Sequence, residues 1–255
     1  MLDKININKI IEIAVEAGSK ILEVYRQDFE VETKKDHSPI TQADQRSHNH
    51  IVARLTDLFP TIPILSEEGR HTPYSEREKW EYYWLIDPLD GTKEFVKRNG
   101  QFTVNIALIW EQRPVVGVVY APVPDTLYFA KKGHGAYKRE NGKTPARLCP
   151  DPYPTSDDKP LRVAVSSSHP SDALTQYLSQ LNVGEKVEMG SSLKLCLVAD
   201  GKADIYPRLG PTMEWDTAAA HAVVNEAGKK VYRYDSTEEV VYNKKNLLNP
   251  WFKVC

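Results

Sequence analysis

The most informative stretch of this sequence is Ile86-Asp87-Pro88-Leu89-Asp90-Gly91-Thr92-Lys93-Glu94. It follows the apolar residues 82–85, which predict a buried strand. Pro88 has no N–H group and cannot continue a central sheet, so we expect Asp87 at the strand's end, where the chain turns toward solvent. Gly91 permits a tight turn, and a helix can then begin within residues 92–98.

The carboxylates of Asp87 and Asp90 are therefore expected beside a helix N-terminus. Carboxylate oxygens bind hard cations, and the free N–H groups at the start of a helix suit an anion such as phosphate. Together these are the parts of a metal-assisted phosphatase. Ordinary turn chemistry explains Asp-Pro followed by Asp-Gly equally well, so this run alone leaves both interpretations open.

The composition is that of a soluble globular protein of one large domain or two modest ones. Among 255 residues, 41% are hydrophobic and 27% are charged, and the net charge of −2 gives no reason to expect a nucleic-acid polymer as partner. The sequence lacks the basic and apolar regions of a signal peptide, and no apolar run approaches the ~18 residues of a membrane span.

The three cysteines, Cys149, Cys196 and Cys255, form no CxxC or Cys/His cluster, so we expect neither disulfides nor zinc. A reducing cytoplasm is the expected location. Peripheral association with the cytoplasmic face of the inner membrane is compatible with the sequence. No protein partner is indicated.

Periodicity predicts two helices and then a largely antiparallel sheet in the first part of the chain. The helices are expected at residues 7–25 and from Thr41 to Pro60, the second with an apolar stripe at His48, Ile51, Val52, Leu55 and Phe59. Polar loops are expected at residues 32–40 and 70–81. Strands are expected at residues 62–66, 82–87, 102–110, 115–120 and 127–130.

Residues 150–160 contain four prolines and no periodicity, which indicates a domain boundary. We expect an N-terminal α+β domain at residues 1–155, with most of the candidate metal ligands, and a C-terminal α/β domain at 156–255 that completes the site. Beyond the boundary, strands and helices alternate. They are predicted at residues 161–165, 171–181, 186–189, 192–199, 204–206 and 216–228.

Further acids lie where predicted strands end or helices begin. Glu67 and Glu68 end a short strand, although a surface Glu pair is usually just solvated. Asp44 stands three residues after Thr41, as in a capping box, and can both cap a helix and face a metal. Asp216 opens a helix of small residues. An N-cap role is the default for it, but small residues also permit close approach to another layer.

Hydroxyl and N–H donors are expected near these acids. Residues 166–170 end a strand with Ser-Ser-Ser-His-Pro, and residues 190–194 open a helix with Gly-Ser-Ser-Leu-Lys. Both are plausible caps, and both are clusters that could hold phosphate. Arg208 lies shortly before Asp216, although a lone Arg is normally a surface charge.

In this order, Glu67-Glu68, residues 87–92 and Trp215-Asp216-Thr217-Ala218-Ala219 resemble the inositol monophosphatase superfamily of magnesium-dependent, lithium-sensitive phosphatases. The similarity spans nearly the whole chain. Residues 90–95, 97–100, 102–107, 190–194 and 206–208 are similar to the bacterial branch that acts on 3'(2'),5'-bisphosphate nucleotides. Lys93-Glu94 stands where inositol phosphatases usually have Thr-Asn.

The resemblance implies an α+β fold, a layered αβαβα sandwich with the site between the two parts of the chain. It implies hydrolysis of a small nucleotide bisphosphate, adenosine 3',5'-bisphosphate, to AMP and phosphate, a recycling step of sulfate assimilation. It also implies two or three Mg²⁺ ions. Glu67, Asp87 and the Leu89 carbonyl would hold one, Asp87, Asp90 and Asp216 a second, and Asp44 would lie near a third.

The resemblance further implies that water activated by the metal attacks phosphorus in line. Thr92 and Asp44 would take the proton of this water, and Glu68 would orient it. The nucleotide and its other phosphate would meet His169, Ser191, Lys194 and Arg208. The remaining residues expected at the substrate are Glu67, Leu89, Asp90, Gly91, Thr92, Lys93 and Asp216.

Two alternatives remain at this stage. One is a related phosphatase for inositol phosphate or fructose bisphosphate, against which Lys93-Glu94 and Arg208 argue. The other is a non-catalytic regulator that binds Mg²⁺ or a nucleotide. The complete set of acids argues against it, because a decayed site would be expected to lose at least one.

Overall fold

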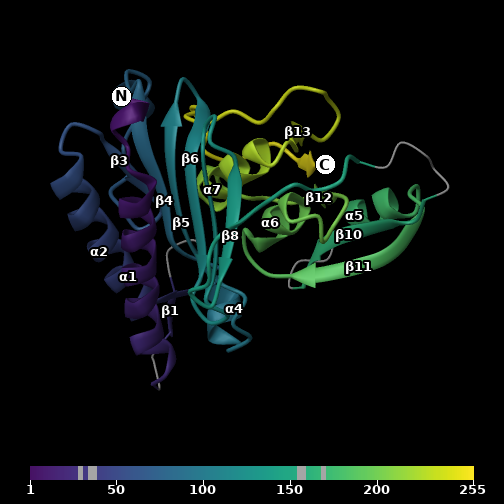
Figure 1. Cartoon of the computed structure of the whole chain (residues 1–255), viewed down its shortest axis with the longest axis horizontal. Coiled ribbons are helices and arrows are strands. Elements are labelled where there is room, and N and C mark those ends of the chain that lie inside the picture. The colour runs from purple at the N-terminus through teal and green to yellow at the C-terminus, as the bar shows by residue number, and fades with distance from the viewer. Residues whose placement is uncertain (28–30, 34–38, 154–158, 168–170) are drawn as a thin grey trace.

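A computed structural model describes residues 1–27, 31–33, 39–153, 159–167 and 171–255. It has five layers (Figure 1). Helices α1 (Ile7–Tyr25) and α2 (Gln42–Leu58) cover one face of a large sheet, and α6 (Leu193–Ala199) and α7 (Glu214–Glu226) cover the other. Smaller sheets and α5 (Asp172–Leu178) follow. The expected layered α+β sandwich is confirmed.

The large sheet has seven strands, ordered β3-β4-β5-β6-β7-β8-β9. Only the pair β3–β4 is parallel, and the other five pairs are antiparallel. The strands are β3 (Ile64–Ser66), β4 (Tyr82–Asp90), β5 (Thr103–Trp110), β6 (Arg113–Ala121), β7 (Thr126–Lys131), β8 (Ala136–Glu140) and β9 (Ala146–Arg147).

The alternation of side chains along β4 decides which layer each residue meets. Trp84 and Ile86 belong to the core under α1 and α2, whereas Tyr83 and Leu85 belong to the core under α6 and α7. Asp87 follows Tyr83 and Leu85 at spacings of four and two residues, so its side chain points to the same face of the sheet. Its carboxylate therefore faces the C-terminal half of the chain.

Strand β4 runs through Pro88, so the expectation that it ends at Asp87 was wrong. Asp87 pairs with Asn105 and Asp90 pairs with Thr103, so β4 has one residue more than β5 at this bulge. The bulge removes Pro88 from the ladder, and its missing N–H therefore costs no hydrogen bond. It also brings Asp90 to the same face as Asp87 in spite of their odd spacing.

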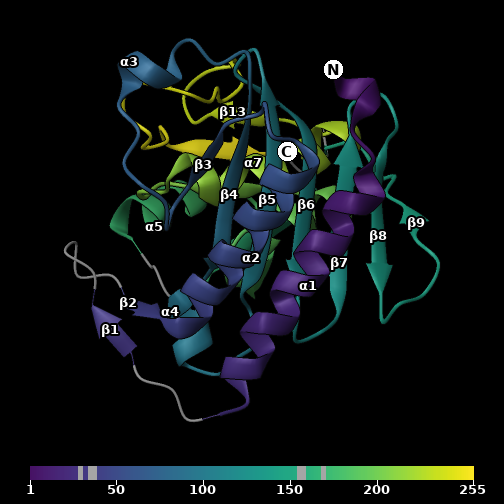
Figure 2. The same ribbon diagram turned by 90° about the vertical axis from the view of Figure 1, so that its left-hand side faces the viewer.

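Helix α2 begins after Thr41, in the capping box that the sequence predicts. Ile51 and Leu55 are buried as expected, but His48 is only half-buried and hydrogen-bonds through Nδ1 to Ser66 Oγ at 2.9 Å. Val52 and Phe59 pack at the rim of the core. The polar loop before α2 contains instead the paired strands β1 (Val31–Thr33) and β2 (Pro39–Thr41) (Figure 2).

The C-terminal part contains two small sheets. Strands β10 (Leu161–Ser166) and β11 (Val183–Met189) are parallel, and β12 (Tyr206–Arg208), β14 (Phe252–Val254) and β13 (Val231–Arg233) form an antiparallel sheet. The predicted alternation of strands and helices is present. Strand β12 begins two residues later than expected, because Ile205 makes only an isolated bridge to Val163.

Several short elements were missed. The loop expected at residues 70–81 contains helix α3 (Tyr74–Arg77), and β8, β9, β13 and β14 had no clear pattern. The 3-10 turn Leu2–Lys4 precedes α1. Residues 154–158 of the expected domain boundary lie outside the described residues. One core cluster contains residues from both sides of that boundary, such as Tyr83 and Val223.

Within the described residues, no helix is long and apolar enough to cross a membrane.

Candidate metal and phosphate site

Three carboxylates from three elements meet at the edge where β3 and β4 end. Asp87 comes from the bulge of β4, Glu67 directly follows β3, and Asp216 lies in the first turn of α7. One oxygen of each lies within 4.8 Å of the others. This convergence fits a hard cation, which takes its ligands from oxygen.

Asp216 is the third residue of α7 and not its N-cap, which corrects the default assignment. Its Oδ2 accepts a hydrogen bond from Met213 N at 2.8 Å, so the side chain reaches back to the N-cap residue. One carboxylate oxygen thus anchors the helix start. The side chain also lines the cavity described below.

The Asp90 carboxylate lies against the loop between β11 and α6. Its Oδ2 accepts hydrogen bonds from Ser192 N at 2.5 Å and from Asn105 Nδ2 at 3.4 Å. Ser192 Oγ bonds Asn105 Oδ1 at 2.9 Å, and Thr103 Oγ1 bonds both Asn105 Oδ1 and Ser192 Oγ. This buried network fixes Asp90 against the second half of the chain.

Asp44 caps α2 as expected and also approaches Thr92. Its Oδ2 accepts hydrogen bonds from Thr41 N and Thr41 Oγ1, each at 2.8 Å, which caps α2. Its Oδ1 lies 3.3 Å from Thr92 Oγ1, which is also 3.4 Å from the Leu89 carbonyl oxygen. Thr92 begins helix α4 (Thr92–Val96) after Gly91, whose φ of +92° favours glycine.

The acids destabilise one another's charged forms. Burial, followed by the charges of Glu67, Asp90 and Asp216, raises the pKa of Asp87 well above its ordinary value. Burial, Asp90 and Glu67 raise that of Asp216 in the same direction. Burial also raises the pKa of Asp90 to about 6, against the opposing effect of Lys194.

A cation would relieve this repulsion. Among the described residues, no Lys, Arg or His forms an ion pair with Asp87, Asp90 or Asp216. Asp87 is buried and Asp90 and Asp216 are half-buried, and carboxylates in such places without an ion pair are costly unless they bind a metal or become protonated. The donor set, entirely oxygen, fits a divalent hard cation.

A cavity of about 260 Å³ opens beside the carboxylates. Lys194 and Arg208 also line it. Lys194 is almost fully buried, and its Nζ donates to the Ser191 carbonyl at 2.6 Å. Burial lowers the pKa of Lys194 to about 8, although Asp90 acts to raise it. The cavity thus combines several carboxylates with the cationic side chains of Lys194 and Arg208.

Most of the predicted site residues line this cavity: Glu67, Asp87, Leu89, Asp90, Gly91, Thr92, Lys93, Ser191, Lys194, Arg208 and Asp216. Asp44 does not line it and reaches it through Thr92. Glu68 does not line it either and lies near His48, whose pKa its charge raises against the stronger effect of burial. His169 lies outside the described residues.

Sequence reasoning missed the polar residues that support Asp90. Thr103 and Asn105 stand two apart in a strand that is otherwise apolar, and both are fully buried. Two polar side chains on one face of a buried strand are the signal that could have found them. Tyr206 and Thr217, which also line the cavity, stand in the motifs that carry the family resemblance but were not named as site residues.

Comparison with known proteins identifies the family. The model of the inositol monophosphatase family matches residues 4–251. The 3'(2'),5'-bisphosphate nucleotidase CysQ of Salmonella typhimurium is 45% identical over 97% of this chain and 98% of its own length, and that of Escherichia coli K12 is 44% identical over the same shares.

Solved structures show the same similarity. The crystal structure of CysQ from Bacteroides thetaiotaomicron, a bacterial member of the inositol monophosphatase family, has a TM-score of 0.84 and 44% identity, and covers 98% of this chain and 96% of its own. The extragenic suppressor protein SuhB from Bartonella henselae has a TM-score of 0.75 and 26% identity, and covers 95% and 92%.

Proposed function

This chain belongs to the inositol monophosphatase family, and from that membership we propose that it is a magnesium-dependent 3'(2'),5'-bisphosphate nucleotidase. It hydrolyses adenosine 3',5'-bisphosphate to AMP and phosphate. The observation that carries the proposal is one cavity that combines the carboxylates of Glu67, Asp87 and Asp216 with the cations of Lys194 and Arg208. Relatives with that activity in their names support the choice of substrate.

The proposed metal ligands are those that the family resemblance implies, and their place in the cavity supports the assignment. Glu67, Asp87 and the Leu89 carbonyl, all at the cavity, would hold one Mg²⁺, Asp87, Asp90 and Asp216 would hold a second, and Asp44 would lie near a third. Bound Mg²⁺ supplies a Lewis acid that acidifies water and offsets the charge of the phosphoryl group. The remaining positions of an octahedral shell would be filled by water and by substrate oxygens.

Thr92 and Asp44 would together accept the proton of the attacking water. Thr92 Oγ1 lies 3.3 Å from Asp44 Oδ1, so it can donate its own proton there and accept a hydrogen bond from the water. In-line attack on phosphorus expels the ribose oxygen. Glu68 does not line the cavity, so its role in orienting the water rests on the resemblance alone.

Lys194 and Arg208 would bind the phosphate groups of the nucleotide. Arg208 Nη2 donates to the Pro211 carbonyl at 2.9 Å, and both residues line the cavity, so the remaining N–H groups of the guanidinium could meet a second phosphate. Ser191 also lines the cavity, and its hydroxyl lies 3.1 Å from Thr103 Oγ1. A substrate with two separated phosphates therefore suits this site better than a monophosphate.

The reaction would recycle a by-product of sulfate assimilation, and we place the enzyme in the cytoplasm. Association with the cytoplasmic face of the inner membrane remains a prediction.

A phosphate-release assay tests the proposal. The purified chain would be given adenosine 3',5'-bisphosphate, inositol 1-phosphate and fructose 1,6-bisphosphate, each with Mg²⁺ and with EDTA. We expect turnover of the nucleotide with Mg²⁺ only, and a loss of at least ~100-fold in Asp90→Asn, which keeps the shape but removes a metal-binding charge.

Other outcomes select the alternatives. Faster release from inositol phosphate or fructose bisphosphate would make the chain a phosphatase of another substrate. Binding of Mg²⁺ and nucleotide without release of phosphate would make it a regulator. Release that persists in EDTA would contradict the metal mechanism.

A further inference from the structure

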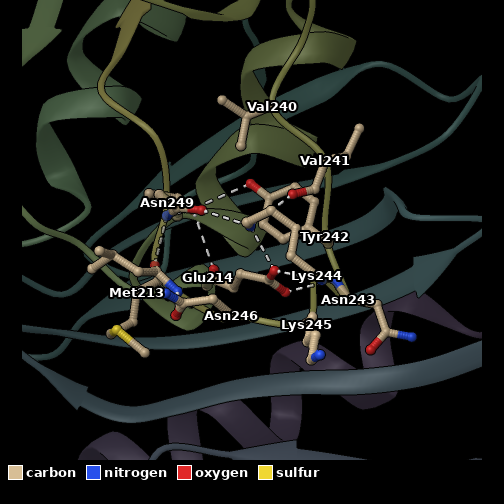
Figure 3. A network of polar contacts seen from close by, with 12 residues as sticks. Met213, Glu214, Val240, Val241, Tyr242, Asn243, Lys244, Lys245, Asn246 and Asn249 are labelled. Carbon is tan, nitrogen blue, oxygen red and sulfur yellow. Dashed lines mark hydrogen bonds and ion pairs between the residues drawn. The ribbon is translucent and has the colours of Figure 1, made fainter. Parts of the chain in front are cut away.

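Glu214 is a fully buried carboxylate at the first position of α7, two residues before Asp216. Its Oε1 accepts hydrogen bonds from Lys244 Nζ at 2.6 Å and from Lys244 N at 3.0 Å, and its Oε2 accepts one from Asn243 N at 2.7 Å (Figure 3). Both oxygens are therefore engaged, and three donors from one segment fix the carboxylate.

That segment, residues 243–249, is here called the C-terminal clasp. It also holds the residue before Glu214. Asn249 Nδ2 donates to the Met213 carbonyl at 2.8 Å and to Thr217 Oγ1 at 3.1 Å. Met213 N in turn donates to Asp216 Oδ2 at 2.8 Å. A short chain of contacts thus leads from the clasp through Met213 to the Asp216 carboxylate.

The clasp reaches the other side of the site through Arg77. This guanidinium is buried, and its Nη1 donates to Asn243 Oδ1 at 2.7 Å, while Asn243 Nδ2 donates to the Arg77 carbonyl at 2.7 Å. Arg77 lies in the connection that begins at Glu67 and leads into β4. The clasp therefore touches both the start of α7 and the segment between Glu67 and Asp87.

Stability alone does not explain such an arrangement. A buried ion pair costs desolvation that its attraction barely repays, and apolar residues of similar volume often stabilise a fold as well. The pair of Glu214 and Lys244 instead fixes the position of the carboxylate, because a carboxylate with three fixed donors has little freedom to shift or rotate. The first turn of α7, which carries Asp216, is thereby held in position.

We propose that Glu214 is a positioning residue of the metal site: together with the clasp it fixes the start of α7, and so the Asp216 carboxylate, relative to Glu67 and Asp87. The inference rests on the proposed function in one respect, that Asp216 holds a metal. Supporting residues around metal ligands typically change metal affinity 10- to 100-fold when mutated.

Glu214→Gln tests this directly. The amide retains the shape but has one acceptor oxygen, so one of the two backbone N–H groups loses its partner and Lys244 loses its countercharge. Titration calorimetry with Mg²⁺ alone would give the Kd, and kinetics would give kcat and KM. We expect the Kd to rise by ~10-fold or more, with kcat falling more than KM rises.

The matched control is Glu239→Gln. Glu239 pairs with Lys230 at 2.6 Å and approaches His221, which lies on the same helix α7 but beyond the first turn. Both variants should lower Tm. Only Glu214→Gln should weaken Mg²⁺ binding. If that variant does not fold, Asn249→Leu, which removes the donor to Met213, carries the same expectation.

Each outcome decides the question. Equal Mg²⁺ affinity in wild type and in the variants that fold would overturn the positioning role and leave the proposed function intact. Equal weakening by Glu239→Gln would also overturn it, because general loosening of α7 would then suffice. A wild type that binds no Mg²⁺ would overturn the proposed function and this inference with it.

Discussion

Arg208 is the residue that should distinguish a bisphosphate from a monophosphate. If its guanidinium pairs with the non-reacting phosphate, Arg208→Ala should cost about 2–4 kcal/mol in kcat/KM on adenosine 3',5'-bisphosphate. The kcat/KM for adenosine 3'-monophosphate, which lacks the second phosphate, should hardly change in the variant. Kinetics of both proteins on both nucleotides would measure this coupling. Equal losses on the two substrates would assign Arg208 to the reacting phosphate or to the fold.

Lys194 should give the reaction an alkaline limit. Burial lowers its pKa to about 8, so the ammonium is charged below that pH and becomes neutral as the pH rises through it. Loss of this charge weakens attraction to phosphate, and kcat/KM should therefore fall above a pH of about 8. Lys194→Arg keeps its charge throughout this range. A profile from pH 6.5 to 9.5 with the same alkaline limb in both proteins would contradict the assignment.

At the scale of single residues, the sequence indicates acids well and their supports poorly. Asp87 and Asp90 stand out because further acids, Glu67 and Asp216 among them, also lie where predicted strands end or helices begin. Asn105 and Ser192 have ordinary local roles in a strand and a helix start. Their importance comes from meeting Asp90 across 15 and 102 residues of chain, which no local pattern encodes.

Helix α7 approaches the sheet closely at one point, and this contact should be intolerant of a single methyl group. A Cβ on Gly117 of β6 would lie 2.1 Å from the Ala219 carbonyl oxygen and 2.7 Å from Ala222 Cβ. Because a backbone atom cannot yield like a flexible side chain, Gly117→Ala must displace the helix. Overpacking of this kind typically costs about 1–3 kcal/mol.

Urea unfolding and Mg²⁺ titration would test this displacement. We expect Gly117→Ala to lower both stability and Mg²⁺ affinity, since the moved helix carries Asp216. Gly142→Ala is the comparison. Nothing lies within 4 Å of that Cβ, and its φ of +66° alone should cost roughly 1 kcal/mol. An unchanged Mg²⁺ affinity in Gly117→Ala would show that the site tolerates movement of α7.

At the scale of elements, the long periodic segments were predictable and the irregular ones were not. Helix α1 and strands β5 to β7 follow from their apolar patterns. The bulge in β4 was not foreseen, because Pro88 excludes a regular ladder but not a ladder that skips it. The start of α7 was predicted too late, with Asp216 as the N-cap in place of Met213. An acid at the third helical position lies in the same N-terminal turn as an N-cap, and the sequence alone does not separate the two.

At the scale of the whole molecule, the layers came from resemblance and not from periodicity. The pattern of strands and helices predicts a sheet and an α/β part, but not that α6 and α7 lie between two sheets. That placement depends on contacts between residues far apart in the chain, such as Tyr83 and Val223 in one core cluster. The expected division between residues 155 and 156 therefore marks a change in sequence pattern, but one hydrophobic core cluster contains residues from both sides of it.

Because the proposed metal site draws ligands from both parts of the chain, Mg²⁺ should stabilise the whole fold. At 100 times the Kd, a ligand that binds only the folded state adds about 2.7 kcal/mol, which for a chain of this size raises Tm by roughly 5–10 °C.

Asp216→Asn should raise the stability of the metal-free protein and reduce the effect of Mg²⁺. It removes one charge from a repelling cluster while keeping an oxygen for Met213 N. Its Tm in EDTA should therefore exceed that of the wild type, and Mg²⁺ should raise it little. Thermal unfolding of both proteins with and without Mg²⁺ gives all four values. A large Mg²⁺-dependent rise in Asp216→Asn would place the stabilising ion elsewhere, and a lower Tm of this variant in EDTA would mean that the Asp216 charge favours the metal-free fold.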